Sequence, residues 1–198
     1  MTRLGGKVVS GESMLELDFL IVTDAFEDDF VDIIAQPFST SIVVRTRRRT
    51  WTPDFLIRRR TGFHELVEVK HLNWLYHKDP EKRALARARW QAMAAAARER
   101  NFLLRLLTED EIRVQPRLIN AKLIHRHCSP LAPKADLIRA ISALVYLPDN
   151  SDVRALGEVL GKDLEGQALP LANRLERAGH IRIDRRSRYS RQSRFSKI

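Results

Sequence analysis

Two acidic residues and a lysine lie inside an otherwise apolar, strand-like stretch at residues 50–72, TWTPDFLIRRRTGFHELVEVKHL. Because side chains alternate across a strand, Glu68 and Lys70 share a face about 7 Å apart, and Asp54 is expected on the neighbouring strand, about 4.8 Å across. Two carboxylates this close repel each other, so the pKa of one rises strongly unless a cation lies between them. Magnesium accepts two carboxylates together with phosphate oxygens and waters. The pattern therefore predicts that Asp54 and Glu68 hold Mg²⁺, for which Mn²⁺ can substitute.

The residues around this pair fit the hydrolysis of a phosphodiester. Lys70 can orient the attacking water and stabilise the charge that develops on the phosphorane. The backbone carbonyl of Val69 is a further candidate metal ligand. Glu16 lies near the apolar stripe of a predicted helix, where an ionised carboxylate needs a partner such as a metal-bound water or a second metal. An acid from a helix, an aspartate from one strand and Glu-x-Lys from the next together predict a metal-dependent phosphodiesterase.

The spacing of these residues alone also fits a different interpretation. An Asp…Glu-x-Lys match is frequent by chance, and a surface hairpin with an ordinary Glu–Lys ion pair would show it too. Pro53 directly before Asp54, the apolar flanks and an upstream helical glutamate favour the nuclease interpretation.

Periodicity and capping signals predict the elements that position these residues. Apolar residues at helical spacing follow Ser10 and Ser13, either of which can cap a helix. Asp79-Pro80-Glu81 combines an N-cap, a proline at the first helical position and an acid in the first turn. The order of elements predicts a mixed α/β sheet flanked by helices. In chain order we expect a helix over 10–25, strands over 30–37 and 40–46, a basic loop at 47–49, a hairpin of strands 50–58 and 64–70, a long helix from residue 79 to about 100 and a buried strand over 101–108.

The composition changes after Thr108, where prolines interrupt a basic connector that carries one short helix. We therefore expect two domains, at residues 1–114 and 115–198. In the second, three helices followed by a two-stranded hairpin are typical of a winged helix-turn-helix. The segments are helices over 135–147, 151–161 and 168–179 and strands over 180–184 and 188–195.

The charge of the chain favours a polyanionic partner. Lys and Arg total 35 against 25 Asp and Glu, a formal net charge of +10, which fits a protein that binds nucleic acid. Two arginine runs bracket the proposed active strand, and an arginine-rich tail fits a wing that follows a phosphate backbone. Solvated turns and a solubilising tail are the alternatives. The candidate DNA contacts are Arg47, Arg48, Arg49, Arg58, Arg59, Arg60, Arg185, Arg186, Arg188, Arg191 and Arg194.

The sequence also indicates a compartment. The single cysteine, Cys128, excludes a disulfide within the chain and fits a reducing environment. No stretch approaches the length of a membrane span, and the N-terminus lacks an apolar leader. We expect a cytoplasmic protein of the prokaryotic cytosol or nucleoid with no membrane partner.

Four short segments, ESMLELDFL, AQPF, TPDFLI and VEVK, are followed by a long helix containing RARWQ, in this order over about residues 12–112. In this set and order the chain resembles the TnsA transposon-end endonucleases of the PD-(D/E)xK restriction-endonuclease-like superfamily. Carried over by position, the family's helical acid falls on Glu16 and its PDF aspartate on Asp54. The acid-x-lysine pair falls on Glu68 and Lys70. The family can carry Gln at the position of Glu68; glutamate is closer to the superfamily pattern and keeps metal binding.

The resemblance implies a fold, a reaction and partners. It implies a restriction-endonuclease-like sheet followed by a winged-helix-like C-terminal domain. The activity would be metal-dependent cleavage of the 5′, non-transferred DNA strand at transposon ends, as one subunit of a heteromeric transposase. A DDE-type transposase would cut the other strand, and the C-terminal domain would contact DNA and an AAA+ regulator ATPase. Two alternatives stay open: a stand-alone restriction or repair nuclease of the same superfamily, and a non-catalytic DNA-binding adaptor whose acids are structural.

Overall fold

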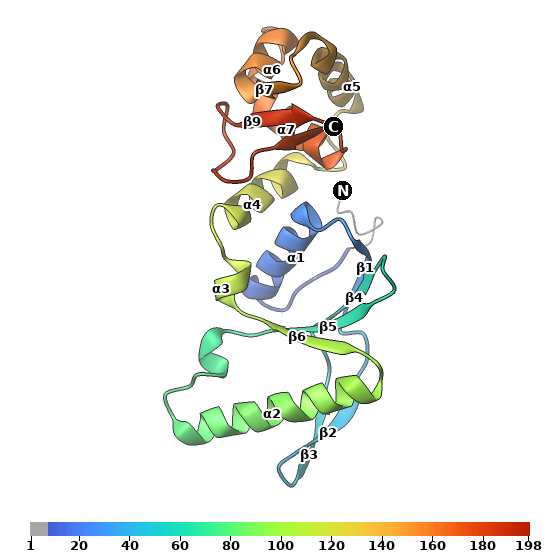
Figure 1. Ribbon diagram of the computed structural model, residues 1–198, viewed down its shortest axis with the longest axis vertical. Coiled ribbons are helices and arrows are strands. Elements are labelled where there is room, and N and C mark those ends of the chain that lie inside the picture. Colours follow the sequence, from blue (N-terminus) through green and yellow to red (C-terminus); the bar gives the residue numbers. More distant parts are fainter. Residues whose placement is uncertain (1–7) are drawn as a thin grey trace. The chain divides into compact units, whose positions relative to one another are not determined.

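Four short segments rich in aliphatic residues pair into a mixed sheet in the order β1-β4-β5-β6 (Figure 1). Strands β1, β4 and β5 are antiparallel neighbours, whereas β6 runs parallel to β5. The computed structural model describes residues 8–198, which divide into one unit ending at Val114 and another spanning Gln115–Ile198. The sheet belongs to the first unit, and its strands are β1 (Phe30–Ala35), β4 (Phe55–Arg59), β5 (His64–Val69) and β6 (Leu103–Leu107).

One face of this sheet is covered by α1 (Met14–Phe26). Ser13, one of the two serines that the sequence offers as a cap, is its N-cap, because the hydroxyl accepts a hydrogen bond from a backbone N–H of the first turn. Phe19 packs from the helix against Phe55 of β4, with ring centroids 5.3 Å apart. The short helix α3 (Glu109–Ile112) closes the same core.

The opposite face is covered by the long helix α2 (Pro80–Glu99) and by a hairpin of β2 (Thr40–Val44) and β3 (Arg47–Trp51). The predicted start of α2 is confirmed, with an aspartate N-cap and proline in the first turn. Met93 of α2 packs with Leu66 of β5 in this second core. The sheet is therefore covered on both sides, which explains why its central strands are apolar on both faces. A short helical turn, η1 (Leu72–Trp74), follows β5.

Three expectations for the strands are wrong. Residues 47–49 are not a loop: they begin β3, which pairs with β2 through a two-residue turn at Arg45 and Thr46. The predicted strand over 50–58 is two strands, because the chain leaves β3 after Trp51 and enters β4 only at Phe55. Pro53 between them has no N–H to donate to a ladder. The strand predicted as buried, β6, lies at an edge of the sheet, and its Leu103 is 61% exposed.

The second unit has a core of its own. Leu156, Leu171, Leu175 and Ile181 are fully buried in it. The three predicted helices are present, and the predicted hairpin forms, with a third strand that the sequence did not indicate, in the order β7-β9-β8. The elements are α4 (Arg117–His127), α5 (Lys134–Ala143), η2 (Leu144–Tyr146), β7 (Asn150–Asp152), α6 (Val153–Leu160), η3 (Glu165–Gln167), α7 (Ala168–Arg177), β8 (Ile181–Ile183) and β9 (Arg194–Lys197).

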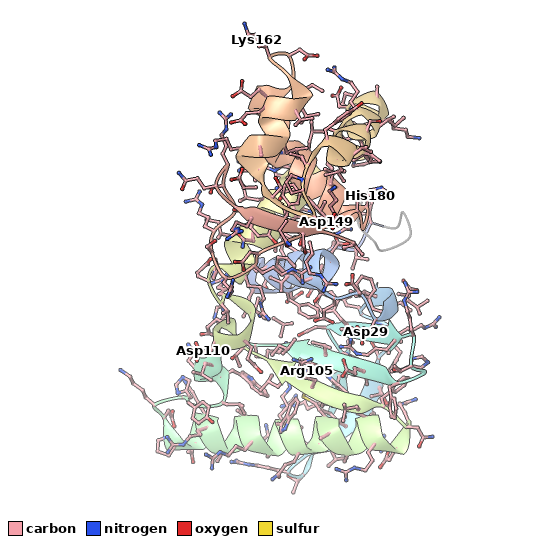
Figure 2. The ribbon with its side chains drawn as sticks, turned by 45° about the horizontal axis from the view of Figure 1, so that its top comes forward. Asp29, Arg105, Asp110, Asp149, Lys162 and His180 are labelled. Carbon is pink, nitrogen blue, oxygen red and sulfur yellow. The ribbon has the colours of Figure 1, made fainter. Side chains whose placement is uncertain are left out.

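Charged side chains stand out from the surfaces of both units (Figure 2). Across residues 8–198, no helix combines the length and the apolar character that crossing a membrane requires.

Candidate active site

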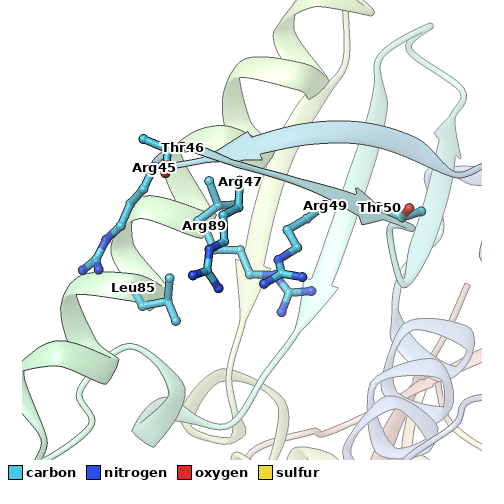
Figure 3. A pocket seen from close by; sticks show the side chains of 8 residues that line it. Arg45, Thr46, Arg47, Arg49, Thr50, Leu85 and Arg89 are labelled. Atoms are coloured by element: carbon cyan, nitrogen blue, oxygen red, sulfur yellow. The ribbon is translucent and has the colours of Figure 1, made fainter.

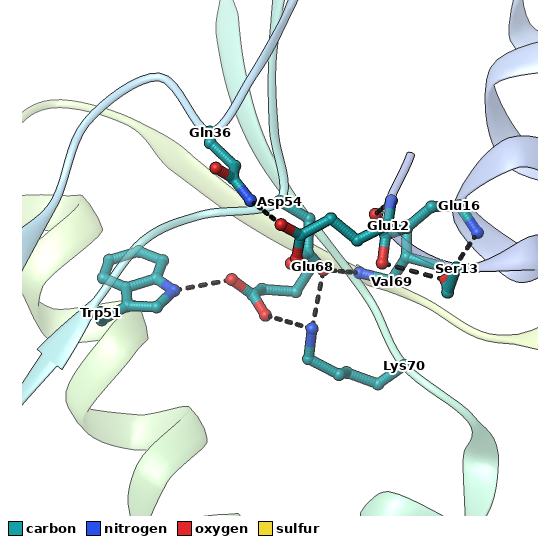
Figure 4. A network of polar contacts seen from close by, with 9 residues as sticks. All are labelled: Glu12, Ser13, Glu16, Gln36, Trp51, Asp54, Glu68, Val69 and Lys70. Carbon is teal, nitrogen blue, oxygen red and sulfur yellow. Dashed lines mark hydrogen bonds and ion pairs between the residues drawn. The ribbon is translucent and has the colours of Figure 1, made fainter. Parts of the chain in front are cut away.

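Asp54, Glu68 and Lys70 meet in the first unit. The ammonium Nζ of Lys70 lies 2.7 Å from Asp54 Oδ2 and 3.0 Å from Glu68 Oε2 (Figure 4). The antiparallel pairing of Phe55 with Val67 fixes this arrangement, because one step back along the first strand and one step forward along the second bring position 54 opposite position 68. The sequence prediction that these three side chains converge from two neighbouring strands agrees with this geometry.

The alternation of side chains along β5 puts Glu68 on the face that α2 and the β2–β3 hairpin cover. Val67 and Val69 point into the core beneath α1, whereas Leu66 lies in the core beneath α2. The Glu68 carboxylate is consequently buried, and the indole Nε1 of Trp51 donates a hydrogen bond to its Oε1 at 2.6 Å. Sequence reasoning missed this role of Trp51. The available signal was that a buried indole N–H needs an acceptor.

The site has one positively charged ammonium between two carboxylates, and burial together with this excess of negative charge shifts the pKa values of Glu68 and Lys70. Burial raises the pKa of Glu68, and the neighbouring Asp54 carboxylate raises it further, against the opposing effect of Lys70. Burial acts to lower the pKa of Lys70, but the two carboxylates outweigh it and raise the pKa of the amine. The Lys70 ammonium lies between the two carboxylates and reduces their mutual repulsion. Carboxylate oxygens are also the ligands that Mg²⁺ accepts, so Asp54 and Glu68 have the chemistry of candidate ligands.

The backbone of Val69 fixes the orientation of Asp54. Its N–H donates to Asp54 Oδ2 at 2.7 Å. In an extended strand the N–H and C=O of one residue point to the same side. The carbonyl of Val69, the predicted additional ligand, therefore faces the side of β5 on which Asp54 lies.

Among the described residues, Glu16 forms no hydrogen bond or ion pair with Asp54, Glu68 or Lys70, and it connects to them only through Glu12 and Gln36 (Figure 4). Its carboxylate accepts hydrogen bonds from the Ser13 hydroxyl at 3.0 Å and from the Glu12 backbone N–H at 2.8 Å. These bonds cap the first turn of α1, because the carboxylate accepts from a backbone N–H and a hydroxyl next to the start of the helix. Among residues 8–198, no three His, Cys, Asp or Glu side chains group closely enough to hold a metal ion.

Gln36 joins the segment just before α1 to the site, and sequence reasoning did not identify it. Its side-chain amide donates to Glu12 Oε1 at 2.6 Å, and its backbone N–H donates to the carbonyl oxygen of Asp54 at 3.0 Å (Figure 4). The backbone at Gln36 is left-handed, with φ of 47°, a conformation that costs free energy for a residue other than glycine. Gln36 belongs to AQPF, one of the segments on which the family resemblance rests, and this was the available signal for its role.

Residues 27–109 match a protein-family model described as TnsA-like endonuclease N terminal. This match covers most of the first unit, which we call the TnsA-like unit. The match spans Asp54, Glu68 and Lys70 and begins after α1, the helix that carries Glu16. No curated protein matches the chain significantly. The residues that match the family therefore include the two carboxylates and the lysine that meet in the structure.

The structure divides the predicted DNA-contacting arginines of the TnsA-like unit. Arg59 lies among three carboxylates, at 2.6 Å from Asp29, 2.7 Å from Glu65 and 3.3 Å from Glu27, and its side chain is only 13% exposed. Asp29 is labelled in Figure 2. These acids satisfy the guanidinium, so we remove Arg59 from the candidate DNA contacts. The remaining five are exposed: Arg47, Arg48, Arg49, Arg58 and Arg60.

The candidates of the second unit are all exposed, but three of them contact acids. Arg185 pairs with the buried Glu176, whereas Arg188 and Arg194 stand at the surface and form no ion pair with a carboxylate of residues 8–198. The other two pairs join Arg186 to Asp184 and Arg191 to Glu165, and both are exposed. Because exposed ion pairs contribute little stability, a phosphate can displace them.

Proposed function

We propose that this chain is a metal-dependent DNA endonuclease subunit of a heteromeric transposase. It cuts the 5′, non-transferred strand at the ends of a transposon. The observation that carries the proposal is the meeting of Asp54, Glu68 and Lys70 within the residues that match the TnsA-like family model. Two carboxylates and a lysine at the ends of adjacent strands are the groups that hydrolysis of a phosphodiester needs.

Each residue of the site has a distinct part in the proposed reaction. Asp54 and Glu68 would hold Mg²⁺ or Mn²⁺, with the Val69 carbonyl and Glu16 as further candidates. A bound divalent ion supplies an activated water and offsets charge on the leaving oxygen. Lys70, held between the two acids, stabilises the negative charge that develops on the phosphate.

Two neighbouring groups keep the carboxylates in place. The indole N–H of Trp51 holds Glu68, and the backbone N–H of Val69 holds Asp54. Both donors come from elements packed in the core, so the acids are oriented before substrate arrives. Such preorganisation avoids reorganising the site during the reaction.

We propose that the second unit is a winged-helix-like domain, and the order of its elements supports this. Helices α5, α6 and α7 precede the hairpin of β8 and β9, and β7 extends that hairpin to three strands. We propose that this unit contacts the DNA or an AAA+ regulator ATPase. A DDE-type transposase would cut the opposite strand, and the reaction would take place in the prokaryotic cytosol or nucleoid.

Strand nicking of DNA that carries the transposon ends tests the proposal. Wild type with Mg²⁺ and the partner transposase is expected to nick, and Asp54→Asn to nick at least about 100-fold more slowly, since a group that stabilises the transition state is lost. Asp110→Asn, at an exposed carboxylate of the same unit, is the control and should nick like wild type.

The same assay separates the alternatives. Nicking by the chain without a transposase indicates a stand-alone nuclease, and DNA binding with no nicking under any condition indicates an adaptor. Equal nicking by wild type and Asp54→Asn would overturn the proposed mechanism.

A further inference from the structure

A cleft of about 550 Å³ lies in the TnsA-like unit between the β2–β3 hairpin and α2 (Figure 3). Arg45, Arg47 and Arg49 line it from the hairpin, and Arg89 lines it from the helix. Their guanidinium groups point to the same side of the hairpin (Figure 3). We call these four residues the arginine cleft.

Strand alternation explains why these arginines converge and why Arg48 does not. Arg47 pairs with Val44 and Arg49 pairs with Ile42, and both of these partners are buried in the core against α2. Arg48 pairs with Val43, which is 58% exposed, and therefore faces away from α2. The hairpin thus directs alternate arginines of one run to opposite sides.

The arginine cleft lacks the acids that satisfy arginines elsewhere in the chain. Within residues 8–198, none of its four guanidinium groups forms an ion pair with a carboxylate, whereas Arg59 has three such partners. Like charges around one hollow repel, and the repulsion falls when an anion lies between them. The backbone at Arg45 is left-handed, with φ of 56°, so the turn holds an arginine where glycine is favoured.

β3 connects the arginine cleft to the active site. It ends at Trp51, whose indole holds the buried Glu68. At the rise of an extended strand, Arg49 lies roughly 7 Å and Arg47 roughly 13 Å before Trp51. A strand of nucleic acid that passes the active site can therefore reach the cleft within a few nucleotides.

We propose that the arginine cleft binds the phosphate backbone of DNA beside the scissile bond. This inference rests on the proposed function. Arginine forms bidentate hydrogen bonds to phosphate, and several of them can fix a backbone in register without reading its sequence. Leu85, 48% exposed at the rim of the cleft, offers an apolar surface for a sugar.

Binding of duplex DNA to the full chain without a divalent metal tests the inference apart from catalysis. The triple variant Arg47→Ala, Arg49→Ala, Arg89→Ala is expected to bind at least about 10-fold more weakly at low salt. The slope of log K against log salt should fall by about 2 to 3, since each lost phosphate contact removes about 0.9. Arg87→Ala, at an exposed arginine of α2 that does not line the cleft, should keep the slope of wild type.

Two further arms test whether the triple variant is folded and whether the ligand is a nucleic-acid backbone. The three substituted positions are exposed, so their replacement should leave the fold intact. An unfolding transition that matches wild type will show that the triple variant is folded. Lysine replacements at positions 47, 49 and 89 keep the charge and lose the bidentate geometry, so they should restore the salt slope but only part of the affinity. Inorganic phosphate and a mononucleotide serve as probes for a small-anion site, and their binding in place of duplex DNA overturns the inference.

The outcomes distinguish this inference from the proposed function. If Asp54→Asn stops nicking while the triple variant binds and nicks like wild type, the arginine cleft is not a DNA site and the nuclease proposal stands. If the triple variant loses DNA binding while wild type never nicks, the cleft is confirmed and the nuclease proposal fails.

Discussion

At the scale of single residues, the candidate site depends on a buried carboxylate that is kept in place by two donors. Glu68 is 2% exposed and accepts from the Trp51 indole and from Lys70. A buried acceptor that loses a donor costs the free energy of its desolvation. The hydrogen bond from Trp51 to Glu68 therefore contributes to the free energy of unfolding in addition to the packing of the indole ring.

We expect Trp51→Phe to lower the free energy of unfolding by about 1–3 kcal/mol beyond the packing loss, because the hydrogen bond to Glu68 disappears. Nicking should fall as well, since the carboxylate is less well held. Trp90→Phe is the control: Trp90 packs against the same core, and the described residues give its indole N–H no hydrogen-bond partner. Urea denaturation measures both variants, and equal losses would show that packing alone explains Trp51.

The sequence predicted the residues whose positions follow from strand alternation. Glu68 and Lys70 share a face of one strand, and Asp54 follows from the hairpin. It did not predict Gln36 or the bond from Trp51, because both depend on segments that meet only in the folded chain.

The carboxylates around Arg59 were missed for the same reason. Two of them, Glu27 and Asp29, come from the segment after α1, which is distant in sequence. The run of three arginines at 58–60 therefore looked uniform in the sequence, although Arg59 in its middle is paired with acids in the structure.

At the scale of elements, the first turn of α1 joins a helix cap to a proposed catalytic role. Glu16 accepts from Ser13 and Glu12 at this turn, and Gln36 binds Glu12 beside it (Figure 4). A cap needs only an acceptor, whereas a cation site needs a charge. Glutamine at position 16 keeps the acceptor and removes the charge.

Glu16→Gln is therefore expected to leave the free energy of unfolding within about 0.5 kcal/mol of wild type and to lower nicking about 100-fold. Ser13→Ala, which removes the N-cap, should instead cost about 1 kcal/mol of stability. Chemical denaturation and nicking rates, measured side by side, decide between the two roles. Nicking at the wild-type rate by Glu16→Gln would show that Glu16 only caps the helix.

Helix α7 of the second unit carries a buried acid, Glu176, whose protonation can be tested. Glu176 is buried there and accepts hydrogen bonds from the Tyr189 hydroxyl and from Arg185. Burial raises its pKa despite these partners. The folded state then binds more protons than the unfolded state between the two pKa values, so stability falls as pH rises through that window.

We expect wild type to gain stability relative to Glu176→Gln as the pH is lowered from neutral toward the ordinary pKa of a glutamate, because only wild type takes up a proton at this position. Thermal or urea unfolding of both proteins across the acidic range measures the difference. A difference in unfolding free energy that stays constant with pH would contradict the raised pKa.

Elements with strong local signals were predicted, and those fixed by a distant partner were not. The start of α2 follows from an N-cap aspartate and a proline. Strand β3 was missed because three successive arginines lack the pattern of a strand, and only pairing with the apolar β2 makes them one. β7, three residues long, has no periodicity to detect.

At the scale of the whole molecule, two units with separate cores carry the net charge of +10. The family match ends at residue 109, so it describes the TnsA-like unit and leaves the role of the second unit as a proposal. The sequence indicated a division through a change of composition near Thr108. It could not show which arginines were already paired, and that difference decides which of them are available to DNA.

The central claim is that Asp54 and Glu68 form a divalent-cation site, and titration of the full chain with Mn²⁺ tests it most directly. Calorimetry or the electron paramagnetic resonance of free Mn²⁺ reports binding without any partner protein or DNA. We predict that wild type binds Mn²⁺, that Mg²⁺ competes for the site, and that Asp54→Asn loses the binding whereas Asp110→Asn keeps it. Binding of Mn²⁺ to Asp54→Asn as strong as to wild type, or no binding to either, would contradict the account.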